Sequence, residues 1–229
     1  MQSKEAKKIL GELKKLGTAQ NRKIFARHGV VDEQYGVSYA NLGKLKKKIK
    51  KNHLMALELW ETGNHDARVL ACMIADPMEM KGRLLNDWIR VLNNKVLVGL
   101  FSELVSQGPQ AKKCMEKWTK AKREWISSTG WNMLTELAMG NEALSNQYLE
   151  NFLGRIEADI HKSKNRVRHA MNMALIAIGI RNSTLQKKAI AIAKRIGKVE
   201  VDHGETSCKT PDAVAYIKKT LERKKKKKS

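Results

Sequence analysis

Apolar residues recur at helical spacing along most of the chain. The clearest stripe lies in residues 164–179 and comprises Val167, Ala170, Met171, Ala174, Leu175 and Ile178. Positions related by i, i+3, i+4 and i+7 share one face of a helix, so this stripe predicts a helix with one buried face. Arg166 and Arg168 fall off the stripe, on the side that we expect to be exposed.

Residues 53–77 predict two short helices joined by a tight turn at Gly63 and Asn64. Asp66 can cap the second helix, and Pro77 follows its end because proline cannot continue a helix. A pair this short cannot fold alone, so it requires neighbours of the same kind. We interpret residues 65–68 as fixing the turn and the contact to a neighbouring repeat.

The same periodicity predicts about a dozen helices of roughly 8 to 18 residues. Besides residues 53–77 and 164–179, the predicted helices cover residues 3–16, 41–51, 82–92, 96–106, 111–118, 121–139, 141–161 with a break at Gly154, 184–197 and 211–221. A basic segment covers residues 22–28. Helix pairs recur at about 35 to 45 residues, which favours an all-α fold, a right-handed solenoid of degenerate HEAT-like helical repeats. An irregular helical bundle is the alternative. We expect one domain over residues 1–222 and a basic disordered tail over residues 223–229.

Charge narrows the class of partner. The 229 residues include 45 Lys and Arg against 23 Asp and Glu, a net charge of +22, which favours polyanions. Residues 44–51 carry six lysines with no acid between them. The predicted phosphate contacts are Lys44, Lys47, Arg166, Arg168, Lys194, Arg195 and Lys198. The alternative for each of them is a solvated surface charge.

Cysteine spacing and hydropathy exclude several classes. Cys72, Cys114 and Cys208 form neither a disulfide framework nor a paired metal motif, which suits a reducing cytoplasm. The sequence contains no secretory apolar core and no apolar run of membrane-spanning length. We therefore expect a cytoplasmic monomer that uses no cofactor or metal and does not contact a membrane.

Aromatic and histidine residues add little chemistry. The five tryptophans could stack on bases, but their positions in predicted helices favour packing in the core. For Trp125 and Trp131, beside a loop-like stretch at 127–130, both roles stay open. A metal site could be suspected at His203, Glu205 and Cys208, but these residues lack a second ligand pair, so a loop-fixing hydrogen bond is the favoured interpretation. Without a phosphate loop, nucleophile elbow or zinc motif, the motifs name no reaction.

Four blocks of the sequence carry a family resemblance. They read YGVSYANLGKLKKKIKKNH, ALELWETGNHDARVLACMIADP, SKNRVRHAMNMALIAIGIRN and IGKVEVDHGETSCKTPDAVAYIKK. Together they resemble the DNA alkylation repair family, the AlkD-like DNA glycosylases, over nearly the whole chain and more loosely between residues 80 and 160. The resemblance implies a HEAT-like solenoid that holds duplex DNA on a concave basic face. It also implies release of positively charged alkylated purines by cleavage of the glycosidic bond, without a metal.

The resemblance places the family's catalytic Trp and Asp, four residues apart, at the start of a middle helix. The corresponding segment here is residues 93–99. Asn94 or Lys95 stands in the place of the Trp, and Val98 or Gly99 in the place of the Asp. An Asp there would stabilise positive charge that develops on the sugar, and losing such a group costs about 10²–10³-fold in rate.

Two further family positions also carry other residues. Ser127 and Ser128 stand where the resemblance implies a catalytic Arg, and Met173 stands where it implies a second Trp. We therefore expect a DNA-binding protein of this family with weak or no base-excision activity and with no catalytic residue at these positions. The alternatives are an active alkylpurine glycosylase with a rearranged site, testable at Asp202 or Glu103, or a solenoid scaffold for protein or RNA partners.

Overall fold

The computed structural model describes residues 3–140 and 143–226, and these residues form helices joined mostly by short connections, with a longer loop over residues 197–212. Within those ranges the only β pairing is an isolated bridge between Gly17 and Val37. The all-α prediction is confirmed. The chain divides into two compact units: unit 1 comprises residues 1–111 and 204–206, and unit 2 comprises residues 112–203 and 207–229. A single domain over residues 1–222 stays a prediction.

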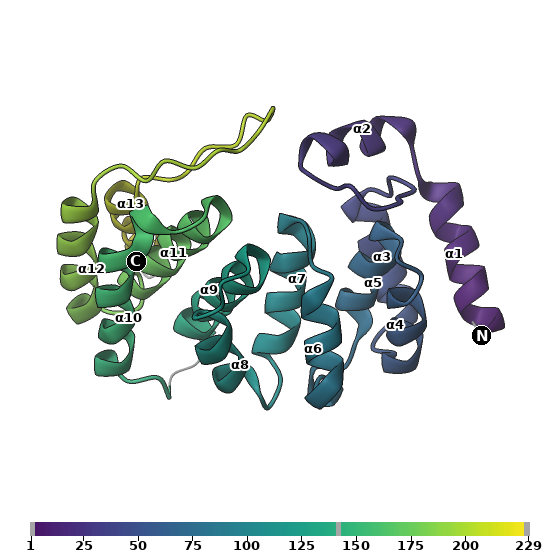
Figure 1. The fold of residues 1–229 in the computed structure, drawn as a ribbon, viewed down its shortest axis with the longest axis horizontal. Coiled ribbons are helices and arrows are strands. Elements are labelled where there is room, and N and C mark those ends of the chain that lie inside the picture. Colours follow the sequence, from purple (N-terminus) through teal and green to yellow (C-terminus); the bar gives the residue numbers. More distant parts are fainter. Residues whose placement is uncertain (1–2, 141–142, 227–229) are drawn as a thin grey trace. The chain divides into compact units, whose positions relative to one another are not determined.

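Unit 1 consists of helices in two rows (Figure 1). Its elements are α1 (Lys4–Leu16), α2 (Ala19–Arg27), α3 (Tyr39–Ile49), α4 (His53–Trp60), α5 (His65–Ile74), the 3₁₀ turn η1 (Pro77–Glu79), α6 (Gly82–Arg90) and α7 (Lys95–Ser106). In one row α5 packs between α3 and α7, and in the other α4 packs against α5 and α1. Trp60 of α4 stacks on Trp88 of α6 with ring centroids 3.9 Å apart, which joins α6 to the second row.

Short polar side chains set where these helices begin. Ser38 accepts a hydrogen bond from the backbone N–H of Asn41 at 3.3 Å, so α3 begins two residues earlier than the apolar pattern predicts. Asn64 accepts from the N–H of Ala67 at 3.2 Å and caps α5 in place of Asp66, which the sequence suggested as the cap. Such caps satisfy N–H groups that the first helical turn leaves free.

Asp66 does not cap α5, and its side chain binds a different segment of the chain. Its carboxylate accepts hydrogen bonds from the backbone N–H groups of Tyr35, Gly36 and Val37, at 2.6, 3.1 and 2.8 Å. The side chain is buried, so these three charge-assisted bonds replace its lost hydration. Arg68 donates to the Trp60 carbonyl at 3.4 Å, in line with the interpretation that residues 65–68 fix the turn, while Asp66 positions the chain directly before α3.

Unit 2 repeats the two-row arrangement with longer helices. Its elements are α8 (Ala111–Trp118), α9 (Glu124–Gly140), α10 (Asn146–Asp159), the 3₁₀ turn η2 (Ile160–Lys162), α11 (Asn165–Gly179), α12 (Ser183–Ile196) and α13 (Ala213–Lys226). The helix α11 packs against both α9 and α13, while α12 packs against α10. A Cβ atom on Gly179 would lie 2.6 Å from Ile217 Cδ1, so the glycine permits the close approach of α11 and α13.

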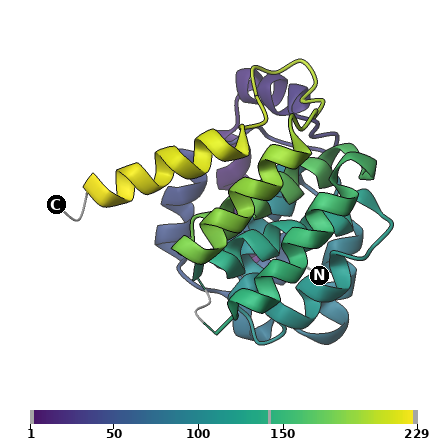
Figure 2. The ribbon, with the colours of Figure 1, turned by 90° about the vertical axis from the view of Figure 1, so that its left-hand side faces the viewer.

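Three details of unit 2 differ from the sequence expectations. The helix α10 continues through Gly154 without a break. The loop-like stretch at 127–130 lies inside α9, where Gly130 meets the backbone of Thr119. Figure 2 shows α13 as one continuous helix, which runs to Lys226 and so includes residues 223–226 of the predicted tail. Residues 227–229 of that tail lie outside the described residues.

Candidate nucleic-acid interface

The lysines of α3 occupy two different environments. Lys44 and Lys47, both predicted phosphate contacts, have exposed side chains and form no ion pair with any described residue. Lys48 instead pairs with Glu12 of α1 at 3.0 Å, and Lys51 pairs with Asp76 at 3.2 Å. Exposed ammonium groups without a protein partner are available to bind phosphate oxygens.

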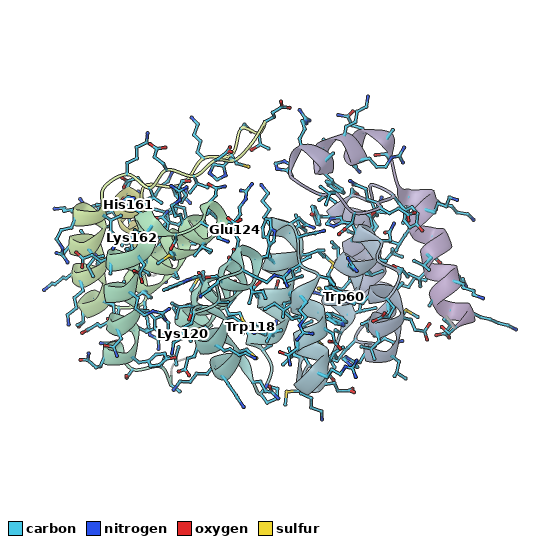
Figure 3. The ribbon with its side chains drawn as sticks, viewed as in Figure 1. Trp60, Trp118, Lys120, Glu124, His161 and Lys162 are labelled. Atoms are coloured by element: carbon cyan, nitrogen blue, oxygen red, sulfur yellow. The ribbon has the colours of Figure 1, made fainter. Side chains whose placement is uncertain are left out.

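The two predicted arginines of α11 lie beside the start of that helix. Arg166 donates its backbone N–H to the Glu124 carboxylate at 2.7 Å, so Glu124 (labelled in Figure 3) caps α11 from α9. The side chains of Arg166 and Arg168 are half-buried. Residues two apart on a helix do not share a face, so these arginines do not form one contact surface.

The predicted residues of α12 are largely engaged by acids. Arg195 binds Glu157 through two hydrogen bonds, with Nε and Nη2 donating at 2.5 and 3.1 Å. This bond lowers the pKa of Glu157 and raises that of Arg195. Lys198 pairs with Glu200 at 2.5 Å, whereas Lys194 is exposed and has no ion pair among the described residues. Exposed ion pairs are weak, so phosphate could replace the acid in either one.

The segment that the resemblance matches to the catalytic Trp and Asp has a structural role in unit 1. Asn94 is buried and caps α7, accepting from the N–H groups of Val96 and Leu97 at 3.2 and 3.1 Å. Val98 is buried in the core, and Gly99 is exposed. No carboxylate therefore stands at these positions.

One acid is nevertheless linked to Asn94. The Asn94 amide donates to Asn93 at 2.9 Å, and Asn93 donates to the Asp32 carboxylate at 2.8 Å. Asp32 also lies 3.5 Å from a guanidinium nitrogen of Arg68, which in turn sits over the Trp60 ring at 5.4 Å. Sequence reasoning missed this link, because Asp32 is about sixty positions away along the chain and no local pattern marks it.

The tryptophans are mainly packing residues. Trp60, Trp88, Trp118 and Trp131 are at most 3% exposed, which leaves no face open to a base. Trp125 is half-buried. The prediction that most tryptophans belong to the core is confirmed, and Trp131 joins that group.

A polar hollow of about 340 Å³ lies in unit 2. Three cationic side chains line it, Lys120 and Lys162 (both labelled in Figure 3) and Arg155, together with the acid Asp159. Arg155 donates to the Thr119 hydroxyl and carbonyl at 3.3 and 3.1 Å, and burial lowers its pKa. The excess of positive charge could hold one phosphate. The sequence offered no signal for this group, because its residues come from three separate elements.

The loop before α13 contains the histidine considered as a metal ligand. A ring nitrogen of His203 lies 3.0 Å from the Thr210 hydroxyl, which confirms the interpretation of a loop-fixing hydrogen bond. Among the described side chains, no cluster of three or more His, Cys, Asp or Glu residues is arranged to hold a metal ion. None of the helices that the structure describes combines the length and the apolar character needed to cross a bilayer.

Comparison with known proteins identifies the family. Residues 9–217 match the family described as "DNA alkylation repair enzyme". An uncharacterized protein of Listeria innocua is 33% identical over 93% of this chain and 95% of its own length, and one of Listeria monocytogenes is 32% identical over the same shares. The chain belongs to the DNA alkylation repair enzyme family.

A solved structure shows the same fold. It superposes with a TM-score of 0.87 at 31% identity, covering 95% of this chain and 94% of its own. That protein is described as one of a new family related to the HEAT-like repeat DNA glycosylases, with affinity for branched DNA structures. The predicted HEAT-like repeat fold is therefore confirmed. The predicted phosphate contacts remain predictions.

Proposed function

We propose that this protein binds duplex DNA, including branched forms, through basic residues of α3, α11 and α12. The observation that carries this proposal is the close structural relative with affinity for branched DNA structures. The net charge of +22 supports it, because neutralising phosphates and releasing counterions drives binding to DNA. The seven predicted contacts are the proposed positions, and among the described residues Lys44 and Lys47 have no ion-pair partner.

We further propose weak or absent base-excision activity. Asn94 caps α7 and Val98 lies in the core, so neither can balance the positive charge that develops on the sugar as the base departs. A preorganised group of that kind contributes about 10²–10³ in rate. We expect the protein to act as a monomer in the cytoplasm, where three cysteines outside any disulfide suit a reducing environment.

Two assays test this function. Fluorescence anisotropy on a duplex and on a matched four-way junction should show binding to both, with log affinity falling by about 0.9 per phosphate contact for each log unit of salt. Absence of binding to either DNA at low salt would overturn the proposal. A release assay on alkylated DNA should yield no free alkylpurine above the uncatalysed rate.

The family description favours one alternative, an alkylpurine glycosylase with a rearranged site. Asp32 is then the acid to test first, because hydrogen bonds link it through Asn93 to Asn94. Alkylpurine release that is detected with the wild-type protein and is absent with Asp32→Asn would establish this activity. Release lost in Glu103→Gln or Asp202→Asn instead would place the chemistry elsewhere.

A further inference from the structure

Unit 1 contains a hollow of about 610 Å³ at the C-terminal ends of α3, α5 and α7. We call it the lysine hollow, because Lys46, Lys47, Lys50 and Lys51 form one wall. Its other walls come from Cys72, Met73, Ala75, Pro77, Leu100, Glu103, Leu104 and Gln107. Its size lies in the range of small-ligand sites, and it combines cations with an apolar floor.

Three of the four lysines that line the lysine hollow have no ion pair with a described residue. Lys46, Lys47 and Lys50 are exposed, and in the part of the chain that the structure describes their ammonium groups form no ion pair or hydrogen bond. Lys51 pairs with Asp76 at 3.2 Å, while Lys48 points to Glu12 and does not line the hollow. These three like charges repel one another, and Glu103 is the one acid among the described residues that line the hollow, so a bound anion would relieve the remaining repulsion.

The backbone at Lys50 gives a second, independent sign of function. Lys50 has φ 62° and ψ −151°, and it is the only non-glycine residue of the described chain with a positive φ. This region is almost restricted to glycine, because a Cβ atom is strained there. Strained backbone conformations cluster at active sites and ligand-binding sites.

The C-terminal end of α12 can be compared directly with the strained backbone at Lys50. Gly197 ends α12 in the same conformation, with φ 68° and ψ −146°, and its N–H binds Ala193 four residues back. Lys50 ends α3 with the matching bond to Lys46. Glycine meets the backbone requirement at one helix end, and a strained lysine that lines a hollow occupies the other.

We propose that the lysine hollow binds a single unpaired nucleotide of branched DNA, an inference that rests on the proposed function. The phosphate lies among Lys46, Lys47 and Lys50. The base lies on the apolar floor, which includes Leu100 and Leu104. An inorganic phosphate alone would leave these apolar side chains exposed to water, whereas the base of a nucleotide would cover them and add the free energy of apolar burial.

Two residues on the floor side suit the edge of a base. Glu103 is exposed at the hollow and offers carboxylate acceptors for an exocyclic amino group. Gln107 donates its amide to the Glu103 carbonyl at 3.2 Å and still has an acceptor free for a base. These groups would select orientation, while the lysines would supply most of the attraction.

The test compares two fluorescein-labelled DNA probes by anisotropy. One is a nicked duplex with a single unpaired, 5′-phosphorylated cytidine nucleotide at the nick, and the other is the same nicked duplex without it. Wild type should prefer the first roughly tenfold, the effect of about one charge-assisted hydrogen bond. Lys50→Gly should bind the two probes equally while melting at or above the wild-type temperature, because its strain is removed.

Lys48→Ala is the matched control, since it removes the same charge from the same helix outside the hollow and should keep the preference. A double variant, Lys46→Ala with Lys47→Ala, should lose it as Lys50→Gly does. Equal binding of both probes by wild type, or an unchanged preference in Lys50→Gly, would overturn the lysine hollow proposal alone. Binding of neither probe by wild type would overturn the proposed function as well.

Discussion

The helices α3 and α12 are both rich in basic residues and differ in what their charges do. Both are followed by a C-cap residue with φ near +65°. In α12 Lys188 and Arg195 pair with acids of α10, and the C-cap residue is Gly197. At the end of α3, most lysines of the lysine hollow have no ion pair among the described residues, and the C-cap residue is Lys50.

The difference separates two uses of positive charge. Paired residues of α12 help hold that helix against α10, at the modest strength of exposed ion pairs. Unpaired lysines of α3 contribute nothing of this kind and keep their full attraction for phosphate. Net charge alone therefore does not identify a binding surface, and the pairing of each charge has to be known.

The largest effect is expected from removing Asp66, which positions the segment directly before α3. Asp66→Ala should leave the N–H groups of Tyr35, Gly36 and Val37 without their acceptor, the last two of them buried, and should cost about 3 kcal/mol or more in the free energy of unfolding. Denaturant unfolding measures the loss, and hydrogen exchange should locate it in unit 1. Asp212→Ala is the control, because Asp212 accepts one exposed N–H, from Ala215, and its loss should cost about 1 kcal/mol. Equal losses would contradict the role of Asp66.

The second effect contrasts the two sets of charges directly. Combining Lys46→Ala, Lys47→Ala and Lys50→Gly should weaken junction binding roughly 10²-fold at moderate salt, with a lower salt slope. Removing three paired charges that are not proposed contacts, with Lys48→Ala, Arg83→Ala and Lys188→Ala, should weaken it by less than about tenfold. Anisotropy over a salt series measures both. If the two triple variants weaken binding equally, net charge rather than pairing governs the interaction.

The third effect exchanges the two helix ends. Gly197→Lys should lower the free energy of unfolding by about 1–3 kcal/mol, because it introduces the strain that Lys50 already carries. Lys50→Gly should raise it by about 1 kcal/mol, a rise of about 2–4 °C in Tm for a chain of this length. Differential scanning calorimetry measures both changes. A destabilised Lys50→Gly would show that the α3 end is not strained.

The smallest effect tests the acid partners of α12 through pH. The hydrogen bond from Arg195 lowers the pKa of Glu157 below its ordinary value of 4.5. A lowered folded pKa adds stability above the unfolded pKa, and this contribution is lost as pH falls through the folded value. Glu157→Gln should therefore narrow the difference in Tm between pH 7 and pH 3, and Lys194→Gln should not. An unchanged pH profile in Glu157→Gln would show that the pair adds nothing to stability.

The helical architecture could be predicted because it depends on local regularities. Apolar spacing identified α11 as a helix with one buried face, and its observed bounds differ by one residue from the predicted ones. The helix boundaries that moved were those set by caps, such as Ser38 at α3. The end of α13 moved as well, because lysines sustain a helix once its first turns pack.

The chain's sequence by itself determined an all-α repeat fold, a strong positive charge and the resemblance to DNA alkylation repair proteins, since periodicity, composition and motifs are all readable along one dimension. Only the tertiary structure decided which charges are neutralised, because acids such as Glu157 and Glu12 are brought to their partners from 36 or 38 positions away. It alone also showed that Asp66 binds a distant backbone segment and that Lys50 takes a glycine conformation beside a hollow. These features depend on approach in space, which neither helical spacing nor local propensity encodes.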